Sequence, residues 1–240
     1  MVIVFGGEKG GTGKTCLSIN FAICCQVRGK DVLLIDGDKQ RTSVKFCERR
    51  AQLARLTPEL GLRPVLCMER RGDMYDAIEA QVPKYDHIIV DVAGADTPQL
   101  VSAVMIADRL YSPFVPSESD LDTAETIHHR VELTRASGNR ELKSWAVLSQ
   151  VSPYVHSRES EIASAREMLE PFYHLPIAAT VVHQRNAFRK AHTAKRGVVE
   201  VAEMPKAPKG AVQAADEIWA LYEEITGDIF RVKEAVCAEE

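Results

Sequence analysis

Short apolar runs alternate with longer stretches of helical periodicity along the whole 240-residue chain. Runs that are apolar on both faces are typical of strands buried inside a parallel sheet. Their alternation with helices predicts a doubly wound α/β fold, in which helices cover both faces of a mostly parallel sheet. The expected strands are VIVF (2–5), DVLLID (31–36), PVLCM (64–68), HIIVDV (87–92), RLYSPFV (109–115), WAVLSQV (145–151) and IAATVV (177–182).

Helical periodicity is clearest in residues 14–29 and in residues 210–230. The first segment ends at a glycine, which favours helix termination. No internal repeat, low-complexity tract or flexible linker divides the chain, so we expect a single domain over 1–240, with a core over 1–226 and an acidic tail over 227–240. The expected buried positions are Leu17, Phe21, Cys24 and Cys25 in the first helix and Val212, Ala215, Ile218, Trp219, Tyr222 and Ile225 in the second.

The formal net charge of −4 excludes a polycation, so any contact with nucleic acid has to come from a local basic patch. No apolar run approaches the ~20 residues of a membrane-spanning helix, and the N-terminus lacks the residue order of a signal peptide. We therefore expect a cytoplasmic protein with reduced thiols. The cysteines, none in C-x-x-C spacing, are Cys16, Cys24, Cys25, Cys47, Cys67 and Cys237.

A glycine-rich loop, GGEKGGTGKTC (6–16), joins the first expected strand to the first expected helix. In this context the backbone N–H groups of a glycine-rich loop converge on phosphate oxygens, helped by the helix N-terminus. Lys14 is expected to reach the β- and γ-phosphates of a nucleotide, and the Thr15 hydroxyl to ligate Mg²⁺. The expected nucleotide-binding residues of the loop are Gly10, Gly11, Thr12, Gly13, Lys14, Thr15 and Cys16.

The loop departs from the usual G-x-x-x-x-G-K-S/T pattern, because Glu8 replaces the first glycine and Lys9 is added. The stretch KGGTGKT (9–15) resembles the deviant Walker A motif of the ParA/MinD family of ATPases. The resemblance implies that Lys9 crosses a dimer interface and touches the phosphates held by the other subunit. A cation between two facing nucleotides offsets their negative charge, so ATP acts as a dimerising ligand.

Two acidic segments extend the resemblance. DVLLIDGDKQ (31–40) resembles the family's switch I segment D-x-D-P-Q, with Lys39 in place of proline. It implies that Asp38 orients the attacking water, with Asp36 close to Mg²⁺. YDHIIVDVAGAD (85–96) resembles Walker B followed by switch II; it implies that Asp91 holds Mg²⁺ through water and that the Gly94 N–H faces the γ-phosphate.

Two later segments also resemble the family. ADRLYSPFVPSESDLDTAETI (107–127) keeps the proline and serine of a family loop, which implies nucleotide contacts by Pro116 and Ser117. VVHQRNAFRKAHTAKRGVVEV (181–201) resembles a late family block through Arg185, Ala191, Gly197 and Glu200.

The charge of two C-terminal segments distinguishes membrane-binding from DNA-binding members of the family. Residues 211–240 hold eight acidic side chains against Arg231 and Lys233, a balance that anionic lipid would repel. Residues 185–210 hold seven basic side chains against Glu200 and Glu203, which favours contact with DNA phosphates without base reading. Because the loop begins close to the N-terminus, we expect no helix-turn-helix extension. The expected DNA-binding residues are Arg185, Arg189, Lys190, Lys195 and Arg196.

The resemblance as a whole implies a Mg²⁺-dependent ParA-like ATPase with weak intrinsic activity. ATP would close a homodimer that binds double-stranded DNA nonspecifically on the nucleoid, and a ParB-like or other cargo-adaptor protein would stimulate hydrolysis. Plasmid or chromosome partition is the expected role, with no membrane partner. A MinD- or MipZ-type role in division-site or organelle positioning remains an alternative, because QRTSVKFCERR (40–50) resembles the segment after switch I in MipZ.

Two other classes share this loop. Iron–sulfur carriers of the nitrogenase iron protein and Mrp types place cysteines after Walker B or in a late C-x-x-C, whereas this chain has no cysteine between Cys67 and Cys237. Bacterial tyrosine kinases carry a tyrosine-rich tail, and no tyrosine follows Tyr222. Neither class is favoured.

Overall fold

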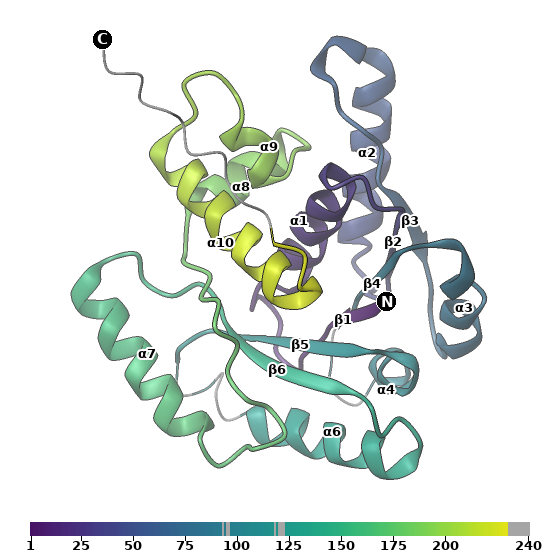
Figure 1. The fold of residues 1–240 in the computed structure, drawn as a ribbon, viewed down its shortest axis with the longest axis vertical. Coiled ribbons are helices and arrows are strands. Elements are labelled where there is room, and N and C mark those ends of the chain that lie inside the picture. Colours follow the sequence, from purple (N-terminus) through teal and green to yellow (C-terminus); the bar gives the residue numbers. More distant parts are fainter. Residues whose placement is uncertain (93, 95–96, 118, 120–122, 230–240) are drawn as a thin grey trace.

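The structure, a computed structural model, describes residues 1–92, 94, 97–117, 119 and 123–229. Within these residues, six strands form one parallel sheet in the order β3-β2-β4-β1-β5-β6 (Figure 1). The sequence-based prediction of a mostly parallel sheet is therefore confirmed. The strands are β1 (Val2–Phe5), β2 (Val32–Asp36), β3 (Leu66–Glu69), β4 (His87–Asp91), β5 (Arg109–Phe114) and β6 (Lys143–Leu148).

Helices cover both faces of the sheet, because each face buries its own apolar cluster. One face packs against α1 (Lys14–Val27), α2 (Thr42–Leu56), α8 (Asn186–Thr193), α9 (Val198–Ala202) and α10 (Lys209–Thr226). The other packs against α3 (Tyr75–Glu79), α4 (Pro98–Ile106), α6 (Ala124–Ser137) and α7 (Val155–Leu169). Short 3-10 helices span Pro58–Leu60 and Val82–Lys84. The doubly wound arrangement is confirmed.

Helix α1 lies in the centre of its layer, between α10 and α2 in Figure 1. All of its predicted core positions are buried. Its end is also as predicted: Gly29 has a φ of 73°, a left-handed conformation that glycine adopts without steric cost, and the Lys30 N–H donates to the Cys25 carbonyl at 3.0 Å. The glycine-rich loop is therefore followed directly by a buried helix.

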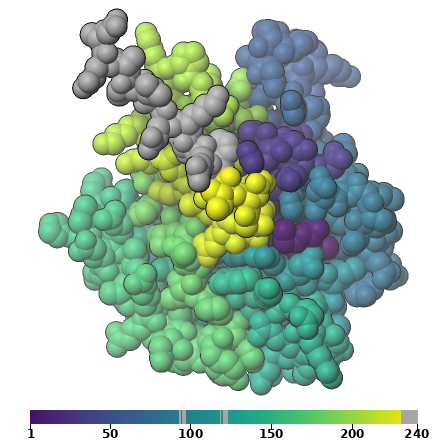
Figure 2. Space-filling view, in the orientation of Figure 1, coloured from purple at the N-terminus to yellow at the C-terminus, as the bar shows by residue number. Residues whose placement is uncertain are grey.

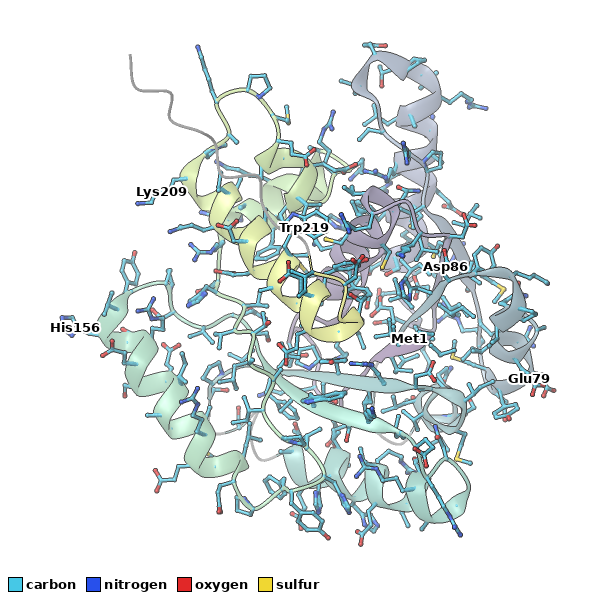
Figure 3. All side chains as sticks on the ribbon, in the orientation of Figure 1. Met1, Glu79, Asp86, His156, Lys209 and Trp219 are labelled. Atoms are coloured by element: carbon cyan, nitrogen blue, oxygen red, sulfur yellow. The ribbon has the colours of Figure 1, made fainter. Side chains whose placement is uncertain are left out.

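Helix α10 packs on α1 through aromatic contacts, with the ring of Tyr222 5.7 Å from both Phe21 and Trp219. Trp219 faces the body of the protein, whereas Lys209 at the first turn points away from it (Figure 3). The predicted inner face is buried except at Val212, which is 40% exposed, so that assignment was wrong. No helix in the described part of the chain has the length and apolarity to cross a membrane. The end of the predicted acidic tail, residues 230–240, lies outside the described residues.

The seventh predicted strand, residues 177–182, is not a strand in the structure. The segment follows β6, and the Ala178 N–H donates to the Ala146 carbonyl at 2.8 Å. A side chain interrupts the ladder, since the Glu224 carboxylate accepts the N–H groups of Ala179 and Thr180 at 2.8 Å each. Only isolated bridges remain, Ala146 with Ile177 and Val151 with His183.

Candidate functional site

The glycine-rich loop lies between β1 and α1, at the edge of the sheet where the parallel strands end. Gly11 and Gly13 have φ values of 81° and 101°, which turn the backbone in a way that side-chain-bearing residues rarely adopt. Lys14 is buried, and its Nζ donates to the Lys9 carbonyl at 2.5 Å and to Thr12 Oγ1 at 3.5 Å. The loop thus curls around the ammonium of its own lysine.

The additional lysine points elsewhere. Lys9 Nζ donates a hydrogen bond of 2.7 Å to Ser119 Oγ, in the segment that follows β5. Pro116 and Ser117, also predicted to contact nucleotide, belong to this same segment. The two lysines of the loop therefore differ: Lys14 turns into the loop, and Lys9 turns toward the loop after β5.

Two carboxylates lie side by side, because β2 and β4 pair in a register that matches Asp36 with Asp91. Asp36 is buried and accepts the backbone N–H groups of Asp38 at 2.9 Å and Val44 at 3.0 Å. Asp91 is also buried and accepts the Ser43 hydroxyl at 2.7 Å. Both carboxylates thereby hold the first turn of α2. Ser43 was not predicted from the sequence, because only strand pairing brings it to Asp91.

Burial raises the pKa of Asp91 to about 6; hydrogen bonds from the Ser43 and Thr15 hydroxyls partly oppose the rise, and the charges of Asp36 and Asp38 add to it. The pKa of Asp36 is also raised, again mainly by burial. Neighbouring buried carboxylates of raised pKa are stabilised by a cation.

The donor atoms at these carboxylates are hard oxygens, which fits Mg²⁺. Among the described residues, no group of three or more His, Cys, Asp or Glu side chains is arranged to hold a metal. A magnesium ion that keeps water and phosphate ligands, with Thr15, Asp36 and Asp91 completing its surroundings, suits such a site.

Asp38 lies half-exposed just beyond β2. Its Oδ1 accepts the Gln40 N–H at 2.9 Å, and its carbonyl accepts the Arg41 N–H at 3.0 Å. These bonds form a tight turn that does not depend on proline, so Lys39 is accommodated and stays exposed.

Gly94 differs from its prediction. The sequence indicated that its N–H faces a γ-phosphate, but in this structure the N–H donates to the Gly7 carbonyl at 3.1 Å. The segment after β4 is therefore fastened directly to the glycine-rich loop.

A cavity of about 690 Å³ opens beside the loop, within the size range of small-molecule sites. Ser149 Oγ donates to the Thr12 carbonyl at 2.6 Å, and Gln150 Nε2 donates to the Gly11 carbonyl, so the two residues after β6 support the loop. Pro116 and Ser117 do not line the cavity. The cavity was not predicted from the sequence, although several of its lining residues lie in or just after the expected strands 145–151 and 177–182. The lining residues include Cys16, Leu17, Gln150, Val182, Gln184 and Phe188.

The predicted DNA-binding residues differ in exposure and in pairing. Arg185 is held in an ion pair, with Nη2 2.7 Å from Glu217 Oε1, and Nη1 donates to Gln213 at 2.8 Å. This pairing joins the start of α8 to α10, so we assign Arg185 a structural role in place of the predicted DNA contact. Arg189 and Lys190 are exposed on α8, whereas Lys195 and Arg196 are half-buried after it.

Known proteins resemble this chain in sequence and in fold. A family model described as ATPase MipZ matches residues 1–148. Protein virC1 from Rhizobium radiobacter is 25% identical over 187 residues, covering 78% of this chain and 78% of that protein. The ATP complex of a McdA variant from Cyanothece superposes with a TM-score of 0.71 at 14% identity, covering 97% of this chain and 98% of that chain. MinD from Pyrococcus horikoshii OT3 with Mg-ADP gives 0.65 at 19% identity, covering 94% and 95%.

The parallel sheet, the glycine-rich loop with its two lysines and the paired aspartates define an ATPase of the ParA/MinD class. At these identities the solved structures establish the fold alone. The family model covers 148 of the 240 residues, and the chain belongs to the ATPase MipZ family.

Proposed function

We propose that this protein is a ParA-like ATPase that closes into an ATP-sandwich homodimer. One observation carries the proposal: Lys14 turns into the glycine-rich loop while Lys9, five residues earlier, turns away from it toward Ser119. With Lys14 turned into the loop, the Lys9 ammonium would exchange its Ser119 partner for the phosphates of another subunit. Single-subunit hydrolysis would need only Lys14.

In this proposal the polar residues of the nucleotide site each have a role in phosphoryl transfer. That reaction depends mainly on positioning and charge neutralisation. The loop from Gly10 to Cys16 binds the phosphates, and Lys14 neutralises their charge. Asp38 orients the attacking water. Mg²⁺, when bound by Thr15, Asp36 and Asp91, supplies further positive charge. The raised pKa of Asp91 supports this assignment, since a cation would stabilise its ionised form.

We further propose that the dimer binds double-stranded DNA nonspecifically through Arg189 and Lys190, and that a ParB-like or other cargo adaptor stimulates hydrolysis. Both side chains are exposed on α8, and neither has an acidic ion-pair partner among the described residues. Plasmid or chromosome partition on the nucleoid is the proposed role. The match to the ATPase MipZ family favours a second candidate, division-site positioning by the same ATPase cycle.

The test is retention on duplexes of unrelated sequence across a salt series, with and without a non-hydrolysable ATP analogue. We expect retention only with the analogue, equal for all sequences, and steeply weakened by salt, because each phosphate contact adds about −0.9 to the slope of log affinity against log salt. Replacing Arg189 and Lys190 with alanine is expected to flatten the slope without preventing dimerisation.

A matched control replaces Arg140 and Lys143, which are also exposed but lie before and at the start of β6, and is expected to leave retention unchanged. Binding to anionic liposomes without binding to DNA would assign the protein to a membrane-associated role and overturn the proposal.

A further inference from the structure

Helix α2 carries much of the positive charge near the glycine-rich loop. Residues 41–55 hold five basic side chains against a single acidic one, Glu48. Lys45 and Arg49 are exposed and lie one helical turn apart, so they share a face of α2. Both lie in the segment QRTSVKFCERR (40–50), but no nucleotide-binding, metal or DNA-binding role was predicted for them.

Packing holds α2 against the segment that contains α8. The ring of Phe46 lies 4.9 Å from that of His192. The next turn brings Arg50, which is fully buried; its Nη1 donates to the Lys195 carbonyl at 2.7 Å, and its guanidinium pairs with both Glu200 oxygens at 2.9 and 2.7 Å. Arg49 is the chain neighbour of Arg50, and its charge acts on Lys195. Both helices lie at the same end of the molecule (Figures 1 and 2).

Two carboxylates near these cations already have basic partners. Glu48 lies 3.8 Å from Arg41, and Glu200 is engaged by Arg50. In the described part of the chain, no carboxylate lies within ion-pair distance of Arg49 or Lys195. Burial, and after it the charge of Arg49, lowers the pKa of Lys195. Like charges held together by a buried scaffold are stabilised when a polyanion binds.

We propose that Lys45, Arg49 and Lys195 form a phosphate-binding surface for double-stranded DNA that joins α2 to the segment after α8. The proposal rests on the DNA binding proposed above and extends it beyond Arg189 and Lys190. DNA is favoured over small anions because the cations are spread over two elements, as contacts along a phosphate backbone require.

The position of the surface has a consequence for regulation. The first turn of α2 is held by the nucleotide-site carboxylates, through Ser43 to Asp91 and through the Val44 N–H to Asp36. One helix therefore contacts the proposed magnesium site at its first turn and the proposed DNA surface at the following turns. DNA and nucleotide would act on the same rigid element of each subunit.

The experiment compares Arg49→Ala with Arg55→Ala in the ATP-analogue-bound dimer. Both residues are exposed arginines on α2, but Arg55 lies six positions further on, on a different face and away from Lys195. We expect Arg49→Ala to reduce the magnitude of the salt slope by about 0.9 for each lost contact, about 1.8 per dimer, and each contact to be worth about eightfold in affinity at 0.1 M salt. Arg55→Ala is expected to match wild type. Sedimentation verifies that both variants dimerise.

The outcomes separate this inference from the function on which it rests. If wild-type dimer does not bind DNA, the proposed function fails and the surface with it. If wild type binds DNA but Arg49→Ala has the wild-type slope, the surface on α2 is overturned and the proposed function stands. An equal loss in Arg55→Ala would also overturn it, because general charge would then explain the effect.

Discussion

Lys9 donates a hydrogen bond from its ammonium to Ser119 Oγ at 2.7 Å, so the additional lysine of the glycine-rich loop is engaged within its own subunit. The contact joins the loop after β1 to the segment after β5. The donor is charged but its Ser119 acceptor is neutral, so this bond lacks the charge–charge attraction of an ion pair. The phosphates of a second subunit would offer a stronger, charge-assisted partner.

Replacing Lys9 with alanine is expected to abolish ATP-dependent dimerisation while nucleotide binding by the monomer persists, because only the cross-subunit cation is removed. Replacing Lys14 is expected to reduce nucleotide affinity itself, since its ammonium lies inside the loop. Sedimentation with a non-hydrolysable ATP analogue, combined with a nucleotide-binding titration, distinguishes the two. Lys84→Ala, which removes an exposed lysine from a 3-10 helix, is the control. Normal dimerisation of the Lys9 variant would exclude the sandwich.

Replacing Asp38 with alanine is expected to leave ATP binding intact and to lower turnover by at least about 100-fold, which traps the dimer. The carboxylate is half-exposed beyond β2 and, among the described residues, accepts the Gln40 N–H, so its loss is not expected to unfold the loop. Phosphate release measures turnover. Asp76→Ala removes an exposed carboxylate from α3 and is expected to behave as wild type. If turnover of the Asp38 variant stays near wild type, the water-orienting role belongs to another group, with Asp36 next.

Periodicity predicted the strands because each is a short apolar run, and the central strands β1, β2 and β4 are buried on both faces. The loop was also predictable, since its glycines and lysines are contiguous in sequence. The failure at residues 177–182 has a nonlocal cause: Glu224, on α10, accepts the N–H groups that a strand would have used.

Site residues that depend on tertiary packing were not predictable in the same way. Ser43 reaches Asp91 only because β2 and β4 pair in register, and Gln150 reaches the Gly11 carbonyl only through the order of the sheet. The charge of Arg185 was read correctly from sequence, but its neutralisation by Glu217 required the fold. Local sequence indicated which groups exist, and the sheet determined which of them meet.

His87 is expected to make stability depend on pH. It is the first residue of β4, and burial, followed by the nearby N-terminal ammonium, lowers its pKa, while Asp86 opposes the shift. Met1 lies beside Asp86 and donates to its carbonyl at 2.7 Å (Figure 3). Because the unfolded chain then binds the proton more tightly, the contribution of His87 is complete above the unfolded pKa of about 6.5 and is lost as pH falls below it.

Urea unfolding between pH 7.5 and 5.5 measures this loss, and His87→Gln, which does not titrate, is expected to lose less stability than wild type over that range. Asp91 acts in the opposite direction: its pKa of about 6 is raised above the unfolded value, so its effect favours the folded state as pH falls. Both proteins contain Asp91, and the difference between their profiles therefore isolates His87. Parallel profiles would contradict the prediction.

The buried pair of Arg50 and Glu200 is expected to show a large asymmetry between single and double replacement. Glu200→Gln leaves the fully buried Arg50 guanidinium without its counter-charge, which typically costs about 3–5 kcal/mol of unfolding free energy. Arg50→Met removes the cation but also the donors to the Arg63 and Lys195 carbonyls.

Combining the two replacements is expected to be less destabilising than the sum of the single ones, because the buried charge and its counter-charge are removed together. The midpoints of urea unfolding measure all three variants, with Arg55→Ala, exposed on the same helix, expected within about 0.5 kcal/mol of wild type. Additive losses would mean that the two charges are independent in the folded state. Arg50 also donates to the Lys195 carbonyl, so the double variant loses a contact between α2 and the segment after α8. We therefore expect the double variant to bind DNA more weakly than wild type, and Arg55→Ala to bind DNA as wild type does.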